Sequence, residues 1–192
     1  MKRSKKAALI LMAPMVPFIL TGCGEKKTEA VVFSSVEECT SMLTTAAADQ
    51  CLADFKAAQA LHPHVAPKYA DKAACEADFG VGQCETAPEQ HASGSFFMPL
   101  MMGYLAGQML NRGGATAQPQ AQAADVRNGV RSQPLYKSAD DRSTFRTASN
   151  TPVARSTGMV DVRPSQVQPK ASRIAQRGGF GAQAASRQSM GG

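Results

Sequence analysis

Four cysteines constrain the fold of this chain more than any other feature: Cys39, Cys51, Cys75 and Cys84. The segment that holds them has about 60 residues, and a core of that size is rarely stable without covalent help. An even number of cysteines in a small exported segment is typical of a disulfide framework. We therefore expect two disulfides here, although four cysteines allow three different pairings.

Two halves of the cysteine-containing segment are similar to each other. In each half an aromatic residue, at position 33 or 69, precedes the first cysteine by six positions, and a glutamine directly precedes the second cysteine. A duplicated unit would pair its own two cysteines. The repeat therefore favours Cys39–Cys51 and Cys75–Cys84 over the other two pairings.

The first 22 residues have the three parts of a secretory signal, which are a basic start, an apolar run and small residues before a cleavage site. The apolar run, Ala7–Leu20, is 14 residues long and contains Pro14 and Pro17. A stable membrane-spanning helix needs about 20 apolar residues. We therefore expect a cleaved signal peptide rather than a permanent transmembrane anchor.

The signal ends in Leu20-Thr21-Gly22-Cys23, which resembles the bacterial lipobox. The resemblance implies that Cys23 becomes the first mature residue and carries a diacylglyceryl thioether and an N-acyl chain. Two or more acyl chains hold a protein stably on a membrane, at roughly 0.8 kcal/mol per buried methylene. By the sorting behaviour of the bacterial lipoproteins that this site resembles, Gly24 in place of an aspartate favours the periplasmic face of the outer membrane over the inner membrane. The alternative is an ordinary signal peptide that a cysteine follows by chance.

Charge divides the mature chain into an acidic head and a basic tail. Residues 24–92 hold five lysines and 11 acidic residues, a net charge of −6, whereas residues 111–192 hold 12 basic and four acidic residues, a net charge of +8. The partners expected for such a tail are an anionic envelope polymer, anionic lipid or the acidic head itself. The alternative is that its arginines only keep it soluble. Few aromatic residues interleave with the arginines, so nucleic acid is not an expected partner.

Serine and aspartate residues that suit helix N-termini predict three helices in the head. They are expected over residues 36–44, 50–62 and 72–79, and the second is expected to end at Pro63. No strand is expected. The predicted fold is therefore a small, all-α, disulfide-stapled head, with the remainder of the chain largely disordered. Its expected core residues are Phe33, Val36, Leu52, Phe55, Leu61, Tyr69 and Phe79.

The most apolar mature segment, residues 93–112, is rich in methionine and glycine. Pro99 suits the first turn of a helix over 99–110, in which Gly103 and Gly107 would form a small-xxx-small face. Such a helix is about 18 Å long and too short to span a membrane. Three roles remain open. The helix covers the core of the head, it self-associates or docks on a partner through Gly103, Tyr104 and Gly107, or it lies in the bilayer surface.

From residue 113 onward the chain has no sustained periodicity. Leucine, isoleucine, valine and phenylalanine make up ten of the 82 residues from Asn111 to the end. That content is below the level of about 20% under which chains rarely fold, so we predict that residues 113–192 are disordered. Within them, Arg177 and Phe180 lie in a glycine-rich motif, which is either a docking peptide or linker sequence.

The predicted organisation has five parts, of which the four-cysteine domain is the part expected to fold. The parts are a signal peptide over residues 1–22, a lipidated tether over 23–32, the four-cysteine helical domain over 33–92, the apolar helix segment over 93–112 and the basic tail over 113–192.

Several blocks of the sequence resemble one family. Cys75–Cys84 reads CEADFGVGQC, Phe96–Met101 reads FFMPLM, and the chain ends in SMGG. Together with the lipobox, these blocks resemble the YgiB-like family of uncharacterised proteobacterial lipoproteins. The resemblance covers most of the mature chain. It implies an envelope lipoprotein and no established activity.

These features predict a non-enzymatic, lipid-anchored envelope protein with an interaction or structural role. No catalytic, cofactor-binding or metal-binding residue is predicted. The alternative is a redox or metal-binding protein that uses the cysteines or His62 and His64, and its metal-binding version pairs the cysteines with His62, His64 and His91. The paired cysteines are separated by 11 or eight residues rather than by the two of thioredoxin-like motifs. Zinc ligands usually come in pairs with two to four residues between them, which also disfavours this alternative.

Overall fold

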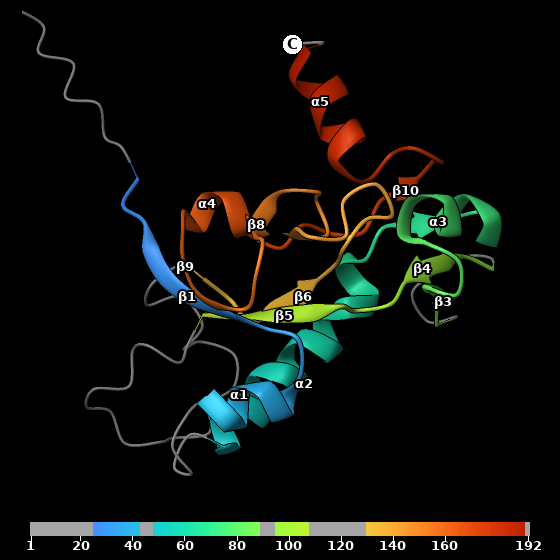
Figure 1. Ribbon diagram of the computed structural model, residues 1–192. Coiled ribbons are helices and arrows are strands. Elements are labelled where there is room, and N and C mark those ends of the chain that lie inside the picture. Colours follow the sequence, from blue (N-terminus) through green and yellow to red (C-terminus); the bar gives the residue numbers. More distant parts are fainter. Residues whose placement is uncertain (1–24, 43–47, 89–94, 108–129, 191–192) are drawn as a thin grey trace, which may run out of the picture.

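Figure 1 shows a computed structural model of the chain, which describes residues 25–42, 48–88, 95–107 and 130–190. Within these ranges the chain forms five helices and ten strands, and the strands assemble into sheets. The prediction of a small all-α fold without strands is therefore wrong. The signal peptide and Cys23 lie outside the described residues.

One part of the core surrounds a four-stranded antiparallel sheet. In spatial order its strands are β6 (Gln133–Leu135), β5 (Gly103–Ala106), β1 (Thr28–Phe33) and β9 (Gly158–Val162). Val31 of β1 pairs with Ala106 of β5 on one side and with Met159 of β9 on the other. The sheet thus joins the predicted tether, the methionine–glycine segment and two parts of the predicted tail.

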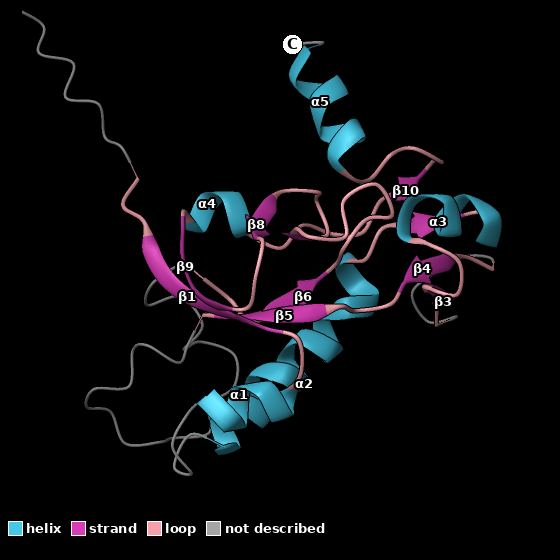
Figure 2. Ribbon diagram, viewed as in Figure 1, coloured by secondary structure: helices cyan, strands magenta, loops and turns pink. Residues whose placement is uncertain are grey.

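Two layers cover the faces of this sheet (Figure 2). One layer holds α1 (Val36–Met42) and α2 (Ala48–Val65), and the other holds β8 (Pro152–Ala154) and α4 (Pro164–Val167). Val31 and Phe33 belong to the core on the α1 and α2 side, whereas Ala30 and Val32 belong to the core on the other side. An uninterrupted apolar strand of this kind is typical of a strand that is buried on both faces.

A second four-stranded sheet carries the other core. Its strands in spatial order are β10 (Ile174–Ala175), β2 (Lys68–Tyr69), β4 (Phe97–Pro99) and β3 (Cys84–Thr86), and α3 (Lys72–Phe79) packs beside them. Phe79 is the centre of an aromatic group, because its ring lies 6.0 Å from that of Tyr69, 6.3 Å from that of Tyr136 and 4.6 Å from that of Phe180. This core therefore combines residues from the head and from the tail.

The three helices predicted in the head are present. α3 has the predicted bounds, and the Asp71 carboxylate accepts a hydrogen bond of 2.7 Å from the N–H of Ala74 at its N-terminus. α2 continues past Pro63 to Val65 instead of ending there. Val65 is buried in the second core, and this packing outweighs the lost backbone donor of the proline. Leu52 is 43% exposed, so its assignment to the core is also wrong.

The methionine–glycine segment forms β4 and β5 instead of the helix predicted over 99–110, of which residues 108–110 are not described. Its glycines are needed where extended chains pass close to one another. A Cβ on Gly103 would lie 2.6 Å from the carbonyl oxygen of Phe33 and 2.9 Å from the ring of Phe145. A Cβ on Gly107 would lie 2.8 Å from the carbonyl carbon of Val130. The small-xxx-small spacing thus serves strand packing and not helix packing.

Gly103→Ala distinguishes the observed strand from the predicted helix, because it should change the free energy of unfolding in opposite directions in the two. In the sheet, the added methyl group meets the backbone of β1, so we expect the free energy of unfolding to fall by about 2 kcal/mol. In the predicted helix, the same substitution would stabilise the protein by about 1 kcal/mol. Urea unfolding monitored by circular dichroism measures the difference, and a stabilised variant would contradict the sheet.

Residues 130–190 of the predicted disordered tail are folded. Besides the strands and the helix already described, they form β7 (Phe145–Arg146) and α5 (Ala182–Met190). The buried large apolar residues of this part are Val130, Leu135, Tyr136, Phe145, Val162, Val167 and Phe180. The composition argument failed because it requires each segment to build its own core, whereas these side chains complete cores whose other half comes from the head. Among the described residues, no helix has the length and apolar character that crossing a membrane requires.

Candidate binding cleft

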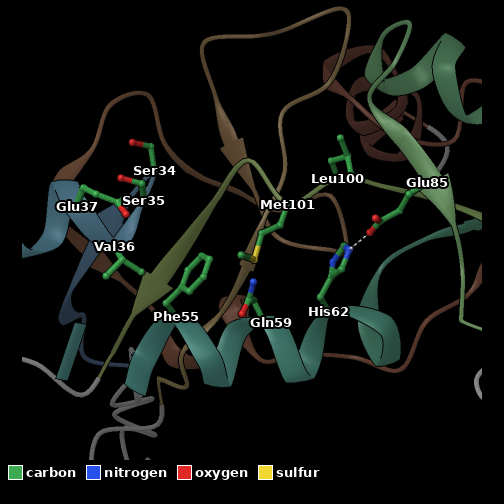
Figure 3. A pocket seen from close by; sticks show the side chains of 10 residues that line it. All are labelled: Ser34, Ser35, Val36, Glu37, Phe55, Gln59, His62, Glu85, Leu100 and Met101. Atoms are coloured by element: carbon green, nitrogen blue, oxygen red, sulfur yellow. Dashed lines mark hydrogen bonds and ion pairs between the residues drawn. The ribbon is translucent and has the colours of Figure 1, made fainter. Parts of the chain in front are cut away.

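A cleft with a volume of about 520 Å³ lies beside α2, beneath the chain that joins β4 to β5 (Figure 3). This volume is within the range of roughly 300–1,000 Å³ found for ligand sites in proteins. Its lining residues are Ser34, Ser35, Val36, Glu37, Phe55, Gln59, His62, Glu85, Leu100 and Met101. They come from the end of β1, from α1, α2 and β3, and from the β4–β5 connection, so only the tertiary fold brings them together.

One face of α2 forms the floor of the cleft. Phe55, Gln59 and His62 are four and three residues apart, a spacing that places them on the same side of a helix. Figure 3 shows all three side chains pointing into the cleft, with Met101 above them. The ring of Phe55 lies 5.5 Å from that of the buried Tyr104, in an edge-to-face arrangement. The floor is therefore the outer surface of a packed core, which holds its shape.

His62 sits at one end of the cleft between two hydrogen-bonding partners. Its Nδ1 lies 2.8 Å from the hydroxyl of Tyr136, and its Nε2 lies 3.3 Å from a carboxylate oxygen of Glu85. An ionised carboxylate only accepts, so the neutral ring donates from Nε2 to Glu85 and accepts from Tyr136 at Nδ1. Burial lowers the pKa of His62, and the hydrogen bond and the charge of Glu85 oppose this shift. Burial also raises the pKa of Tyr136 well above its usual value, so its hydroxyl stays protonated.

The buried neutral state of His62 makes stability depend on pH. The pKa of His62 is lower in the folded than in the unfolded chain, so below about pH 6.5 the unfolded chain binds a proton that the folded chain does not. Stability should therefore fall as the pH drops from about 6.5 through the lower folded pKa. Glu85 and Tyr136 are the titratable groups in contact with the ring.

The measurement is the melting temperature at pH 7.5 and at pH 5 for three proteins. We expect the parent to lose stability at pH 5, and His62→Gln to lose less of it because glutamine does not titrate. The control is His64→Gln, which changes an exposed histidine two residues away and should behave as the parent. An equal pH dependence in the parent and in His62→Gln would contradict the assignment.

The charged groups on the rim of the cleft are acidic. Glu37 and Glu85 are exposed and lie at opposite ends of it (Figure 3). Hydrogen bonds from its own backbone N–H and from Ser35 lower the pKa of Glu37, so this carboxylate is charged at neutral pH. The lining residues include no lysine or arginine. The cleft thus pairs apolar lining residues, which are Val36, Phe55, Leu100 and Met101, with a negative rim.

The four cysteines form two disulfides, Cys39–Cys51 and Cys75–Cys84, which are the pairs that the sequence repeat favours. Their sulfur atoms are therefore not available as thiols in this state. Within the described ranges, no three histidine, cysteine, aspartate or glutamate residues are placed so as to hold a metal ion. Both ring nitrogens of His62 are engaged in hydrogen bonds, with Tyr136 and with Glu85. The arrangement of the described residues therefore does not favour the redox or metal-binding alternative.

The predicted interaction residues do not come together in one site. Gly103, Tyr104 and Gly107 are buried along β5 and just beyond it. Arg177 is exposed, and Phe180 is buried in the second core against Phe79. The glycine-rich motif is therefore docked on the protein's own head.

Asp78 of α3 holds this motif in place. Its buried carboxylate accepts hydrogen bonds from the backbone N–H groups of Gly178 at 2.6 Å, Gly179 at 3.0 Å and Phe180 at 3.1 Å. The hydroxyl of Tyr69 donates a fourth hydrogen bond to it at 2.9 Å. The attachment of tail to head thus uses backbone donors here, rather than the arginine side chains that the charge pattern emphasises.

Sequence reasoning missed the cleft. Its one local signal is the stripe of Phe55, Gln59 and His62 on α2, in which Phe55 was expected in the core and His62 was considered only for redox or metal binding. Glu85 and Met101 lie far from this stripe in the sequence and carry no motif. Their contribution depends on β3, β4 and β5 being strands, which the all-α prediction excluded.

The chain is similar to proteins that have no assigned function. A family model described as "Protein of unknown function (DUF1190)" matches residues 27–191. A UPF0441 protein of Serratia proteamaculans (strain 568) is 29% identical over 198 residues, which cover 98% of this chain and 86% of the relative. A UPF0441 protein of Sodalis glossinidius (strain morsitans) is 30% identical over 186 residues, which cover 93% of this chain and 82% of the relative. No solved structure matches the chain significantly.

Proposed function

The chain belongs to the DUF1190 family of proteins of unknown function, and from this premise we propose that it is a non-enzymatic envelope lipoprotein that binds another molecule of the envelope. The membership confirms the resemblance to an uncharacterised family that the sequence blocks indicate. In this proposal Cys23 carries the lipid anchor, at the periplasmic face of the outer membrane. The folded part presents the cleft beside α2 to its partner.

Two observations support an exported, anchored protein. The first is the basic and apolar N-terminus that ends in Leu20-Thr21-Gly22-Cys23. The second is the pair of disulfides, because such bonds persist in oxidising compartments outside the cytoplasm. Only a few residues separate the lipidated Cys23 from β1, because β1 begins at Thr28. The anchor would thus hold the folded part close to the membrane surface.

The observation that carries the binding role is the cleft itself. It combines an apolar surface, formed by Phe55 on the floor and by Leu100 and Met101 opposite it, with an exposed polar rim, which is the usual composition of a site for non-covalent recognition. The lining group that is best suited to proton transfer, His62, is engaged with the buried Tyr136 through a hydrogen bond. Their burial and mutual contact favour a structural use.

Membrane attachment is tested first, by Cys23→Ser in cells. We expect the variant to keep its signal peptide and to lose acylation, measured by metabolic labelling with a fatty-acid analogue. Normal processing and unchanged labelling of the variant would exclude Cys23 as the anchor.

Partner binding is tested by in-cell photo-crosslinking from benzoylphenylalanine at Gln59, an exposed residue that lines the cleft. The matched control places the probe at Ile174, which is 70% exposed on β10, at the edge of the second sheet opposite to β3. We expect a discrete adduct from Gln59 and none of that mass from Ile174. The absence of discrete adducts from both positions would count against a binding role.

A further inference from the structure

We propose that the cleft beside α2 binds an extended peptide segment of a partner protein, in which basic side chains flank an apolar one. The inference rests on the proposed binding function and specifies its ligand. The argument uses the charge at the ends of the cleft, the apolar surface between them and the one amide side chain on the floor.

The charge of the cleft selects a cationic ligand. Glu37 lies at one end and Glu85 at the other, and the residues that line the cleft include no lysine or arginine. Two carboxylates with apolar walls between them focus a negative potential into the cleft, which attracts cations and repels anions. Lysine and arginine side chains are the cationic groups of proteins, and an arginine fork can bind a carboxylate through two hydrogen bonds.

The middle of the cleft selects an apolar side chain. Val36, Phe55 and Met101 line it, and they pack on the core that holds Phe33 and Tyr104. Methionine side chains adapt to the shape of what they contact, which suits a site for a partner side chain. A ligand with charge alone would leave this surface exposed to water.

Gln59 favours a peptide over a free amine. Its exposed amide lies on the floor between the two carboxylates, with Phe55 and His62 on either side along α2 (Figure 3). An amide both donates and accepts hydrogen bonds, as a peptide group does, whereas an ammonium group only donates. A peptide backbone that crosses the floor can therefore both donate a hydrogen bond to this side chain and accept one from it.

The test uses the purified, oxidised mature chain with Cys23→Ser and four defined probes. The first is the end-blocked hexapeptide Gly-Lys-Leu-Phe-Lys-Gly. The second replaces both lysines by glutamate, the third replaces leucine and phenylalanine by serine, and the fourth is 1,4-diaminobutane. Binding is followed by amide chemical shifts in two-dimensional NMR spectra. We expect the first probe to shift resonances of Gln59, Glu85 and Met101. Each of the other probes should bind at least about tenfold more weakly, because it lacks at least one recognised element.

Variants then locate the site. Glu37→Gln and Glu85→Gln should each weaken the first probe about three- to fivefold, the usual effect of one exposed ion pair, and the effect should shrink at high salt. Gln59→Trp fills the floor and should abolish binding. Its control is Ala60→Trp, which alters the next exposed residue of α2 outside the cleft and should bind as the parent does. Melting temperatures verify that each variant folds.

Several outcomes would overturn the proposal. They are equal binding of the glutamate peptide, equal binding of the free diamine, shifts confined to residues outside the cleft, or no binding of the first probe. The crosslinking experiment keeps this failure apart from failure of the proposed function. Discrete adducts from Gln59 together with no binding of the basic peptide would retain a partner at the cleft and reject its proposed chemistry.

Discussion

Removal of both disulfides is expected to lower the free energy of unfolding by about 6 kcal/mol, which is most of the stability of a typical domain. The bonds close loops with sequence separations of 12 and 9 residues. In the chain-entropy model, loops of this length contribute about 3 kcal/mol each, because the crosslink restricts the unfolded chain. The two effects should add, since Cys39–Cys51 lies in the core beside α1 and α2 and Cys75–Cys84 lies in the second core.

The measurement is guanidinium unfolding of the Cys23→Ser chain, with and without reductant. Two double variants, Cys39→Ala with Cys51→Ala and Cys75→Ala with Cys84→Ala, apportion the loss between the bonds. In the Cys23→Ser background the four disulfide cysteines are the only cysteines of the chain, so each double variant keeps one defined disulfide. An unfolding midpoint that does not respond to the reductant, once thiol titration has shown reduction to be complete, would refute the stabilising role.

Asp78→Ala is expected to destabilise the protein by about 4 kcal/mol and to release the C-terminal segment. The substitution removes the acceptor of four hydrogen bonds, from Tyr69, Gly178, Gly179 and Phe180. A hydrogen bond to a charged group contributes about 1.5–3 kcal/mol, and buried donors left without an acceptor add a desolvation cost. The effects on one carboxylate are not additive, so the expected total is below their sum. Phe180 would then lose the geometry that keeps its ring against Phe79.

Two measurements follow this release. Amide hydrogen exchange should accelerate at residues 178–180, and trypsin should cleave faster after the exposed Arg177. The matched control is Asp140→Ala, because the exposed Asp140 accepts hydrogen bonds from Ala182 and Gln183 at the start of α5. Loss of this helix cap should cost about 1 kcal/mol and leave residues 178–180 protected. Unchanged exchange at residues 178–180 in Asp78→Ala would show that other contacts hold the segment.

Local features of the sequence predicted the helices of the head because their signals lie within a few residues of each other. Asp71 caps α3 through the N–H of Ala74, only three positions away. The disulfide pairs were favoured because the two halves of the head resemble each other, and each bond joins cysteines within one half. Predictions from local signals were wrong where tertiary packing had the larger effect. For example, α2 continues past Pro63, and Val65 is buried.

The strands and the tail were missed because their stabilising partners are distant in the sequence. β1 pairs with β5 and with β9, so its hydrogen bonds depend on segments about 75 and 130 positions away. From the sequence, Gly103 suggested helix packing, whereas in the structure it lies against Phe33 of the neighbouring strand. Likewise, Phe180 suggested linker sequence, whereas in the structure its ring packs against Phe79. The composition of the tail is low in apolar residues because the tail shares cores with the head and does not build its own.

The sequence by itself determined the family, the positions of α1, α2 and α3, and the cysteine pairs it favoured, since each of these depends on short-range order or on matching blocks. Only the tertiary structure decided that the chain is a mixed α/β protein, that residues 130–190 fold, and that α2 faces Glu85 and Met101 across a cleft. The physical reason is that a strand satisfies its backbone hydrogen bonds only through another strand, and no local pattern states which distant segment that will be.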